Sequence, residues 1–276
     1  IAERNPKSVY ACVRGFGDPR TGESPYAHWP SLDAAAQSFG GLVHANDGLV
    51  TPAIADIFPG TLMALGVVSA IHSAQRSGKG QFLDVGMYDA MLAFQKSAVA
   101  QYGFTGKPNP AGLQRAMTLY PFDLFPAKDG RIAIAVGQPR HWDLLCAAME
   151  RPDLMDDERS FSNEARLANV DWVEEQICGW TRNLSRQDIM AKLDGAIPVG
   201  PVQTMEDVYI DPHVSARGML ETCEPAGDNP PISLAASPIK FLDTPTSLYQ
   251  RPPNLGEHNA EVLAEFGIEA PALKKH

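Results

Sequence analysis

Apolar and polar residues follow two different periods along the N-terminal part of the chain. Short apolar runs at residues 9–13 and 81–87 have the length and composition of strands. Helical spacing predicts helices over residues 32–42, 59–75 and 90–101. Strands and helices that alternate in this way predict an α/β fold with layered helices and a sheet.

The helix predicted over residues 59–75 is apolar on nearly every side, which is typical of a helix inside a layered structure. Pro59 suits its first turn and Gly78 suits the position after its end. The surrounding apolar stretch, residues 53–70, is interrupted by Asp56 and Pro59. It is a poor membrane span, and we expect no membrane partner.

The composition changes after residue 101. Residues 102–114 are rich in Gly, Pro and Asn, as in a linker, and the turn and strand "DGRIAIAVG" follows at residues 129–137. Further helices are predicted over 139–150, 170–183, 185–194 and 257–266. Ser185 and Asp188 form a capping box at the start of the third of these. We therefore predict a large α/β domain over 1–105, a linker with a small α+β domain over 106–225, and a return to the large domain over 226–276.

Composition narrows the functional classes. The net charge of −10 argues against a nucleic-acid partner, since phosphate contacts need clustered Lys and Arg. The four cysteines form no Cys-x-x-Cys pair and the seven histidines show no ligand spacing, so we expect no metal site and a reducing, cytoplasmic location. No secretory signal opens the chain, which begins with Ile.

The segment "GKGQFLDVGMYDAML", residues 78–92, places a carboxylate, Asp89, where a strand gives way to a helix. Asp is common at helix starts because its side chain accepts hydrogen bonds from free backbone N–H groups. The other interpretation is catalytic, because a helix N-terminus stabilises an anion that can act as a nucleophile. The pattern alone leaves both interpretations open.

The longer segment "RSGKGQFLDVGMYDAMLAF" resembles the one that carries the active-site aspartate in family III CoA-transferases. Further segments resemble the same family in the same order along the chain. They are "NPKSVYACVRGFG" at 5–17, "SLDAAAQSFGGL" at 31–42, "IADIFPGTLMALG" at 54–66, "DGRIAIAVG" at 129–137, "IPVGPVQTMEDVYIDPHVSARGM" at 197–219 and "PPNLGEHNAEVLAEFGI" at 252–268. The collinear order across almost the whole chain makes the resemblance specific.

The resemblance implies a Rossmann-like large domain, a smaller α+β domain and an interlocked homodimer. It implies coenzyme A and acyl-CoA as substrates with a carboxylic acid acceptor, no tightly bound cofactor, and Asp89 as nucleophile. Family members normally carry a further N-terminal βαβ region that supplies much of the CoA-binding surface. We expect either a truncated or split chain, or a separate chain that supplies this region.

The same resemblance suggests the residues that line the site. Gly15 and Gly17, on either side of Phe16, are candidates for backbone N–H donors, although an ordinary tight turn would also explain them. The residues expected to bind CoA or substrate beside these glycines are Phe16, Ser31, Leu32, Gly137 and Gln138.

Two further acids are candidates for supporting roles. Asp33 falls where formyl-CoA transferases have an acidic residue near the nucleophile, where it would raise the pKa of the first acid; a cap or surface role is the alternative. Asp56 either caps the following helix or takes part in catalysis.

α-Methylacyl-CoA racemases share the fold, and some observations disfavour that alternative. Racemases resemble one another in a Gly-His-Asp triplet, where this chain has Ser31-Leu32-Asp33, and they have Glu at the position of Asp89. They also have Glu where this chain has Gln138. Leu32 and Gln138 cannot exchange protons, which α-proton exchange requires. A non-catalytic partner subunit is a third alternative, and the retained Asp89 speaks against it.

The acceptor acid is suggested by the stretch "QRAMTLYPFDLF" at residues 114–125. Formyl-CoA transferases have a glycine-rich loop over the active site here, whereas this stretch has no glycine, so formate and oxalate exchange are disfavoured. We expect a small dicarboxylate as acceptor. Arg115 is a candidate to pair with its distal carboxylate, or it is a solvated loop residue.

Overall fold

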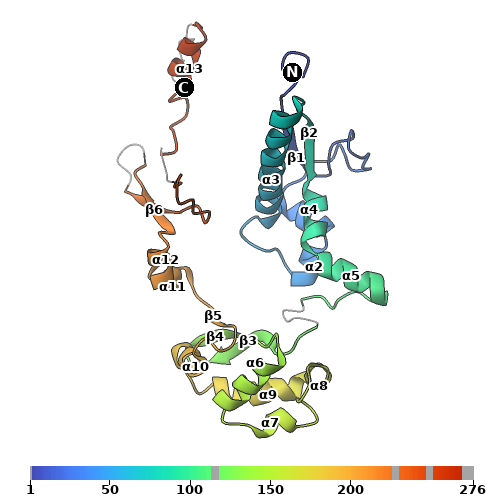
Figure 1. The fold of residues 1–276 in the computed structure, drawn as a ribbon, viewed down its shortest axis with the longest axis vertical. Coiled ribbons are helices and arrows are strands. Elements are labelled where there is room, and N and C mark those ends of the chain that lie inside the picture. The colour runs from blue at the N-terminus through green and yellow to red at the C-terminus, as the bar shows by residue number, and fades with distance from the viewer. Residues whose placement is uncertain (1, 113–117, 226–229, 247–250, 269–276) are drawn as a thin grey trace. The chain divides into compact units, whose positions relative to one another are not determined.

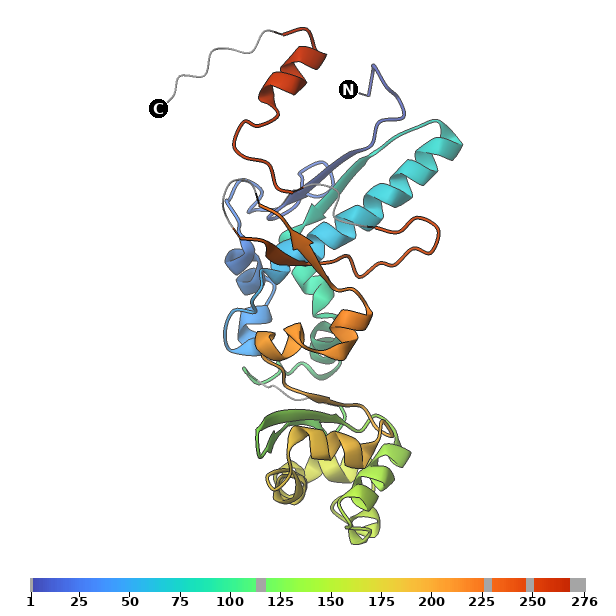
Figure 2. The same ribbon diagram turned by 90° about the vertical axis from the view of Figure 1, so that its left-hand side faces the viewer.

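A computed structural model describes residues 2–112, 118–225, 230–246 and 251–268 (Figures 1 and 2). The chain forms two compact units, Ile1–Val199 and Gly200–His276. Both contain helices and strands, which agrees with the predicted α/β class.

The first part of unit 1 is a two-stranded parallel sheet covered by helices. Strands β1 (Tyr10–Arg14) and β2 (Phe82–Gly86) pair in register, with Tyr10 opposite Phe82 and Arg14 opposite Gly86. The connection between them holds α1 (Asp33–Phe39), α2 (Leu42–Asn46) and α3 (Ile54–Ser77). After β2 come α4 (Met87–Phe94) and α5 (Lys96–Thr105). Both strands lie within a residue or two of the predicted ranges, because their apolar runs are short and end at glycine turns.

Helix α3 differs from the prediction at its start and in its burial. It begins at Ile54, so Pro59 lies inside it. The Ala55 N–H near its start is satisfied by the Asp33 carboxylate at 2.9 Å, which explains how the helix begins before the proline. The helix was predicted to be buried all round, yet Leu65 and Val68 are each 66% exposed. Figures 1 and 2 show α3 running alongside β1 and β2, and it also packs against α1 and α4 within unit 1. By length and composition α3 is apolar enough to cross a membrane, a test that soluble core helices also pass.

The helix predicted over residues 90–101 is divided in two. α4 ends at Phe94 and α5 begins at Lys96, with Gln95 between them. The Gln95 side-chain amide donates to the Gly40 carbonyl oxygen, which ties the break to the end of α1. The predicted linker over residues 102–114 is shorter than expected because α5 continues to Thr105.

The second part of unit 1 is an α+β arrangement. Its sheet has the order β3-β4-β5, with β3 (Phe122–Ala127) and β4 (Gly130–Ala135) antiparallel and β5 at Val199–Pro201. Its helices are α6 (Pro139–Ala148), α7 (Asp153–Asp156), α8 (Asn163–Ala168), α9 (Val170–Thr181) and α10 (Arg186–Leu193). The main core includes Ile132, Ile134, Trp142, Leu145 and Ile177, all fully or nearly fully buried. The Ser185–Asp188 capping box predicted for α10 is confirmed.

Strand β3 corrects the prediction for residues 114–125. That stretch was expected to cover the active site as a loop, but residues 122–125 belong to β3. The pattern concealed the strand because Asp123 and Pro126 interrupt its apolar residues.

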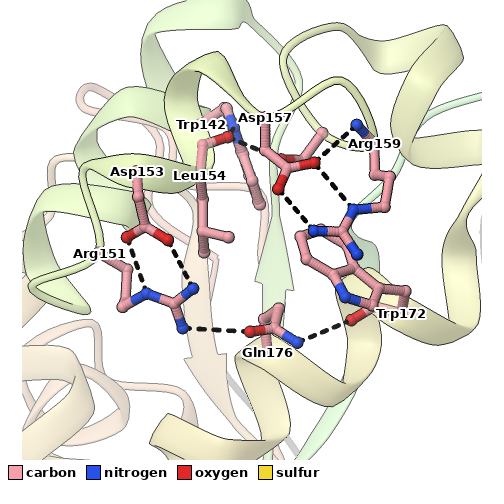
Figure 3. A network of polar contacts seen from close by, with 9 residues as sticks. Trp142, Arg151, Asp153, Leu154, Asp157, Arg159, Trp172 and Gln176 are labelled. Carbon is pink, nitrogen blue, oxygen red and sulfur yellow. Dashed lines mark hydrogen bonds and ion pairs between the residues drawn. The ribbon is translucent and has the colours of Figure 1, made fainter.

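Polar contacts fix the segment that joins α6 to α9 (Figure 3). Arg151 Nη2 pairs with Asp153 Oδ2 at 2.6 Å, and Arg159 Nη2 pairs with Asp157 Oδ2 at 2.7 Å. The Arg159 guanidinium also stacks on Trp172, with Cζ 3.7 Å from the ring centroid. These contacts lie at both ends of the short helix α7, and the Arg159–Trp172 contact joins it to α9.

Unit 2 contains two short helices, a hairpin and a final helix. The elements are α11 (Met205–Tyr209), α12 (Pro212–Ala216), the antiparallel pair β6 (Leu220–Cys223) and β7 (Ile232–Ala235), and α13 (Asn259–Glu265). The final helix lies inside the predicted range 257–266. The hairpin was not predicted, because strand β7 lies in a region dense in Pro and Gly.

Candidate active site

The carboxyl ends of β1 and β2 bring two of the sequence motifs together. The chain leaves β1 through the turn Gly15-Phe16-Gly17 and leaves β2 directly into α4. The Tyr88 N–H, in the first turn of α4, donates to the Gly15 carbonyl oxygen at 3.0 Å. The carboxyl ends of parallel strands are the usual place for ligands in open α/β sheets, so this edge is the candidate active site.

Asp89 lies at this edge as the third residue of α4, and its side chain is exposed. The carboxylate leans over Gly86: a Cβ atom added to Gly86 would lie 2.5 Å from Asp89 Oδ2 and 2.9 Å from Cγ. No side chain caps α4, and the Asp89 carboxylate accepts no hydrogen bond from the residues that the structure describes. The geometry therefore does not support Asp89 as a helix cap, and both of its oxygens remain open to another molecule.

Gly17 approaches the same carboxylate from the other strand. Its φ of +80° suits glycine, and an added Cβ would lie 3.2 Å from Asp84 Oδ2 and 3.8 Å from Asp89 Oδ2. The Gly17 nitrogen lies 3.2 Å from the Cβ position of Gly86. Its N–H donates to none of the described residues, although Gly17 is buried. Asp89 Oδ2 and this unpaired N–H thus flank the same face of Gly86, an arrangement in which the N–H can bind an oxyanion.

Gly15 is required for a close approach between two segments. An added Cβ at Gly15 would lie 2.2 Å from Ser31 Cβ, so the turn packs directly against the segment that precedes α1. The Ser31 hydroxyl is buried and has no hydrogen-bond partner among the described residues. The two predicted segments therefore meet beside the N-terminus of α4.

A polar network on the sheet edge holds the chain after the glycine turn. Asp84 Oδ2 accepts hydrogen bonds from the Asp18 N–H at 2.7 Å and from the Thr21 hydroxyl at 2.8 Å. Asp18, only 3% exposed, is paired with Arg20 Nε at 2.8 Å and with Arg14 Nη2 at 3.1 Å. The hydrogen bonds from the Arg20 side chain are the largest cause that holds the pKa of Asp18 well below its usual range. The ionised Asp18 side chain is thus held by two arginines, and its N–H bond to Asp84 fixes the chain directly after Gly17.

Phe16 anchors the same turn from within. It is 6% exposed, and its ring centroid lies 5.1 Å from that of Phe39 and 5.4 Å from that of Tyr26. The Tyr88 ring, next to Asp89 in sequence, lies 6.4 Å away in an edge-on arrangement. Phe16 therefore supports the site by packing, with little surface left to touch a substrate.

The other acids expected to assist Asp89 have different surroundings. Asp33 Oδ1 accepts from the Ala55 N–H at 2.9 Å and Oδ2 accepts from Gln37 Nε2 at 2.8 Å, so its carboxylate joins α1 to the start of α3. Asp56 is exposed in the first turn of α3 and makes no side-chain cap. Leu32 is 79% exposed. Of the supporting roles considered for Asp33, the capping role is the one that the contacts favour.

Gly137 and Gln138 lie elsewhere in unit 1. They line a cavity of about 320 Å³ together with Arg166, and none of the residues in contact with Asp89 lines it. Arg115 lies outside the described residues. The described parts of the chain hold no group of three or more His, Cys, Asp or Glu side chains that could bind a metal ion.

Several residues of this region were not predicted from the sequence. Asp84 had a signal that was missed, since a carboxylate in the middle of the apolar run "FLDVG" needs a partner when it is half-buried. Gly86 and Asp18 show their roles only through contacts between segments far apart in the sequence. Arg166 stands in an ordinary helical pattern that gives no sign of its burial.

Known proteins share both the sequence and the fold of this chain. Residues 1–259 match the model of CoA-transferase family III. Succinyl-CoA:mesaconate CoA-transferase of Haloarcula hispanica is 38% identical over 274 residues, which cover 97% of this chain and 69% of that protein. Succinate–glutarate CoA-transferase of Agrobacterium fabrum is 34% identical over 271 residues, covering 95% and 66%.

The fold comparison agrees. The crystal structure of a CAIB/BAIF family protein from Brucella suis has a TM-score of 0.76 at 30% identity, with 96% of this chain and 69% of that chain covered. The chain thus spans about two thirds of the length of each relative. The resemblance seen in the sequence motifs is confirmed, and the chain belongs to CoA-transferase family III.

Proposed function

We propose that this protein transfers coenzyme A from an acyl-CoA donor to a small dicarboxylate, with Asp89 as the nucleophile. The observation that carries the proposal is the Asp89 carboxylate itself, exposed at a helix N-terminus and without a hydrogen-bond partner among the described residues. The relatives named above act on succinyl-CoA and mesaconate, and on succinate and glutarate, which are all short dicarboxylates or their CoA esters. Their names support the acceptor class.

The reaction proceeds by covalent steps that each exchange one bond. An Asp89 oxygen attacks the thioester carbon of the donor, forming a mixed anhydride and releasing CoA thiolate. The thiolate attacks the Asp89 carbonyl carbon, giving an aspartyl-CoA thioester and the free donor acid. The acceptor carboxylate attacks this thioester and releases the thiolate again. The thiolate finally attacks the acceptor acyl carbon, which forms the product and restores the Asp89 carboxylate.

The residues around Asp89 have separate tasks in this scheme. Each attack places negative charge on a carbonyl oxygen, and the unpaired Gly17 N–H beside Asp89 is the donor that we assign to it. Gly86 leaves room for the Asp89 side chain to rotate between the free carboxylate that attacks and the anhydride or thioester that it forms. Asp84 and Asp18 hold the Gly17 turn through hydrogen bonds, so the donor does not have to be ordered during the reaction.

We also propose that the enzyme acts as a homodimer. The exposed apolar residues of α3, among them Ile57, Leu65, Val68 and Ile71, form a surface of the kind that proteins cover in an assembly. Light scattering of the purified protein is expected to give twice the mass of one chain. A single-chain mass at assay concentration would remove this part of the proposal.

Isotope transfer tests the role of Asp89. When the acceptor dicarboxylate carries oxygen-18, the anhydride steps leave one labelled oxygen on the Asp89 carboxylate. The tryptic peptide of residues 80–96 contains two acids, Asp84 and Asp89, and fragment masses assign the label to one of them. Turnover without label at Asp89 would contradict the proposal.

Substitution gives the second test. Asp89→Asn is expected to abolish CoA transfer while acyl-CoA still binds, and Asp171→Asn serves as a matched control because Asp171 is an exposed acid in the first turn of α9. Transfer that survives in Asp89→Asn would exclude covalent catalysis by this residue.

A further inference from the structure

A cavity of about 320 Å³ lies between the end of β4 and the start of α8. Gly137 and Gln138 line one side of it, and Ser162, Asn163 and Arg166 line the other. Its volume falls within the range of sites for small organic molecules. Its lining contains several polar groups, and one of them is a buried cation.

Arg166 is only 3% exposed. Its Nε donates to the Tyr120 carbonyl oxygen at 2.6 Å, and its Nη1 donates to the Ser160 carbonyl oxygen at 2.8 Å. The guanidinium carbon lies 4.8 Å from the Trp142 ring centroid. Burial is the largest cause that lowers the pKa of Arg166. The charge is thus held rigidly in a place where water solvates it poorly.

No carboxylate of the described residues lies within ion-pair distance of Arg166. Its Nη2 group makes no hydrogen bond within that part of the chain either. A buried charge without a paired counter-charge is unfavourable, and the two carbonyl oxygens and the more distant carboxylates of Glu164 and Asp143 offset the cost only in part. An anion in the cavity would complete the arrangement, and a carboxylate matches the planar fork of a guanidinium.

Other groups around the cavity favour the same ligand. The Ser162 Oγ accepts from the Ala165 N–H at 3.1 Å, which leaves its hydroxyl hydrogen free to donate. Gln138 stands at the N-cap of α6, and its side chain makes no hydrogen bond with the described residues. The positive end of the α6 dipole lies there as well. Asn163 is already engaged, since its side chain bonds the Thr118 oxygen at 2.9 Å and the Tyr120 N–H at 3.1 Å.

Glu164 also lines the cavity, and its carboxylate is exposed. Its negative charge opposes an anion at the mouth, where solvent screens it, more weakly than Arg166 attracts one in the interior. The asymmetry favours a ligand that places one carboxylate deep in the cavity and leaves its other end toward solvent.

We infer that this cavity is a carboxylate-binding site, with Arg166 as the anchoring cation and with Gln138 and Ser162 as additional donors. The ligand is a small organic acid that is either free or attached to CoA through its other end. The inference stands on the cavity and on Arg166, and it does not depend on the role of Asp89.

Binding to the Asp89→Asn protein tests the inference, since this background prevents turnover. Calorimetric titration with free succinate is one arm; the other compares succinyl-CoA with acetyl-CoA, which lacks the distal carboxylate. Saturable binding of succinate identifies a free acid as ligand, whereas a preference for succinyl-CoA over acetyl-CoA that depends on Arg166 identifies the acyl end. The inference is overturned if folded protein shows no saturation by succinate up to its solubility limit and also shows no such preference for succinyl-CoA.

Variants then assign the site. Arg166→Gln is expected to weaken binding about 10- to 100-fold, as for loss of a charge-assisted hydrogen bond, with Arg166→Lys in between. Arg182→Gln is the matched control, an exposed arginine at the end of α9, and should bind within about twofold of the parent. Fluorescence of Trp142 should change on binding only where Arg166 is present, which a purely structural arginine would not cause.

Arg166 also bonds two carbonyl oxygens, so circular dichroism must first show that its variants fold. If Arg166→Gln does not fold, the double variant Gln138→Ala with Ser162→Ala replaces it. Unchanged affinity in that double variant, or in a folded Arg166→Gln, would overturn the assignment.

Discussion

Replacing Gly86 with alanine places a single carbon atom directly beneath the Asp89 carboxylate. That atom would lie 2.5 Å from Asp89 Oδ2, whereas carbon–oxygen contacts in proteins are about 3.3 Å. The carboxylate must therefore move by about 0.8 Å to restore an ordinary contact. A displacement near 1 Å of a reacting group can reduce the rate about 100-fold, which corresponds to about 2.7 kcal/mol of activation free energy.

The same substitution should cost little stability. Gly86 has φ −75° and ψ 132°, a conformation that alanine adopts without strain. The closest contact is with the end of a side chain, which can rotate away, and the backbone nitrogen of Gly17 at 3.2 Å has to shift by only about a few tenths of an ångström. We expect a loss of about 1 kcal/mol or less in the free energy of unfolding, mainly because alanine is a poor N-cap residue. For a chain of this size that corresponds to a fall in Tm of about 2–4 °C.

Gly66→Ala is the matched control, because an added Cβ there would meet only Leu83 Cδ2 at an ordinary 3.8 Å. It lies in α3 and should raise stability slightly without changing the rate. The assay is steady-state transfer from succinyl-CoA to a dicarboxylate, followed by chromatography of the CoA esters, with thermal unfolding in parallel. If the transfer rates of the Gly86→Ala and Gly66→Ala variants agree within about twofold, the proposed position of the reacting carboxylate is refuted.

Substitutions at three further positions test the surroundings of the site and the fold. Asp84→Ala should reduce the turnover number about tenfold because the Gly17 turn loses the acceptor that holds it. Asp84→Asn should restore part of the rate because its amide oxygen still accepts hydrogen bonds. Equal rates in both variants would contradict this role of Asp84. Gly15→Ala should destabilise by about 1–3 kcal/mol in chemical unfolding, since its Cβ would overlap Ser31 Cβ, which cannot rotate away. The pKa of Asp157 is lowered to about 2, mainly by hydrogen bonds from the Arg159 side chain. The stabilisation of the fold by this pair is therefore complete above the ordinary pKa of about 3.9 and is lost as pH falls toward 2. Asp157→Asn should therefore flatten the fall in Tm across this range, and an unchanged profile would exclude the pair as an acid-sensitive contact.

Most regular elements could be predicted because their signals are local. The runs that became β1, β2 and β4 are short, apolar and bounded by glycine, and α9 and α10 follow the helical period. Burial was harder to predict. The composition of α3 predicts a helix enclosed by other layers, yet Leu65 and Val68 on one face are exposed. Composition shows that an apolar surface prefers burial, but it does not show which part of a protein covers that surface.

The nucleophile and the glycine turn could be located from the sequence because they lie within collinear motifs. The contacts that position them could not, since they join residues about seventy positions apart. Asp84 meets Asp18, and Gly86 meets Gly17, only after β1 and β2 pair in parallel. For Asp33 the family motif suggests a role beside the nucleophile, with a cap as the alternative. Its hydrogen bonds with Ala55 and Gln37 favour the cap, and the sequence does not show these contacts.

The N-cap position of α4 is occupied by glycine, and the neighbouring Asp89 carboxylate accounts for it. Helices α8, α10 and α11 begin at Ser162, Ser185 and Thr204, whose side chains cap them. Helix α4 begins at Gly86, which has no side chain to do so. A capping residue would add about 1 kcal/mol of stability, but its Cβ would occupy the space that the Asp89 carboxylate uses. Several other helices, among them α1, α3 and α9, also lack a side-chain cap, so a missing cap alone does not mark the site. What distinguishes the start of α4 is that a Cβ atom at Gly86 would lie against the Asp89 carboxylate, so glycine at this position keeps room for the nucleophile to react.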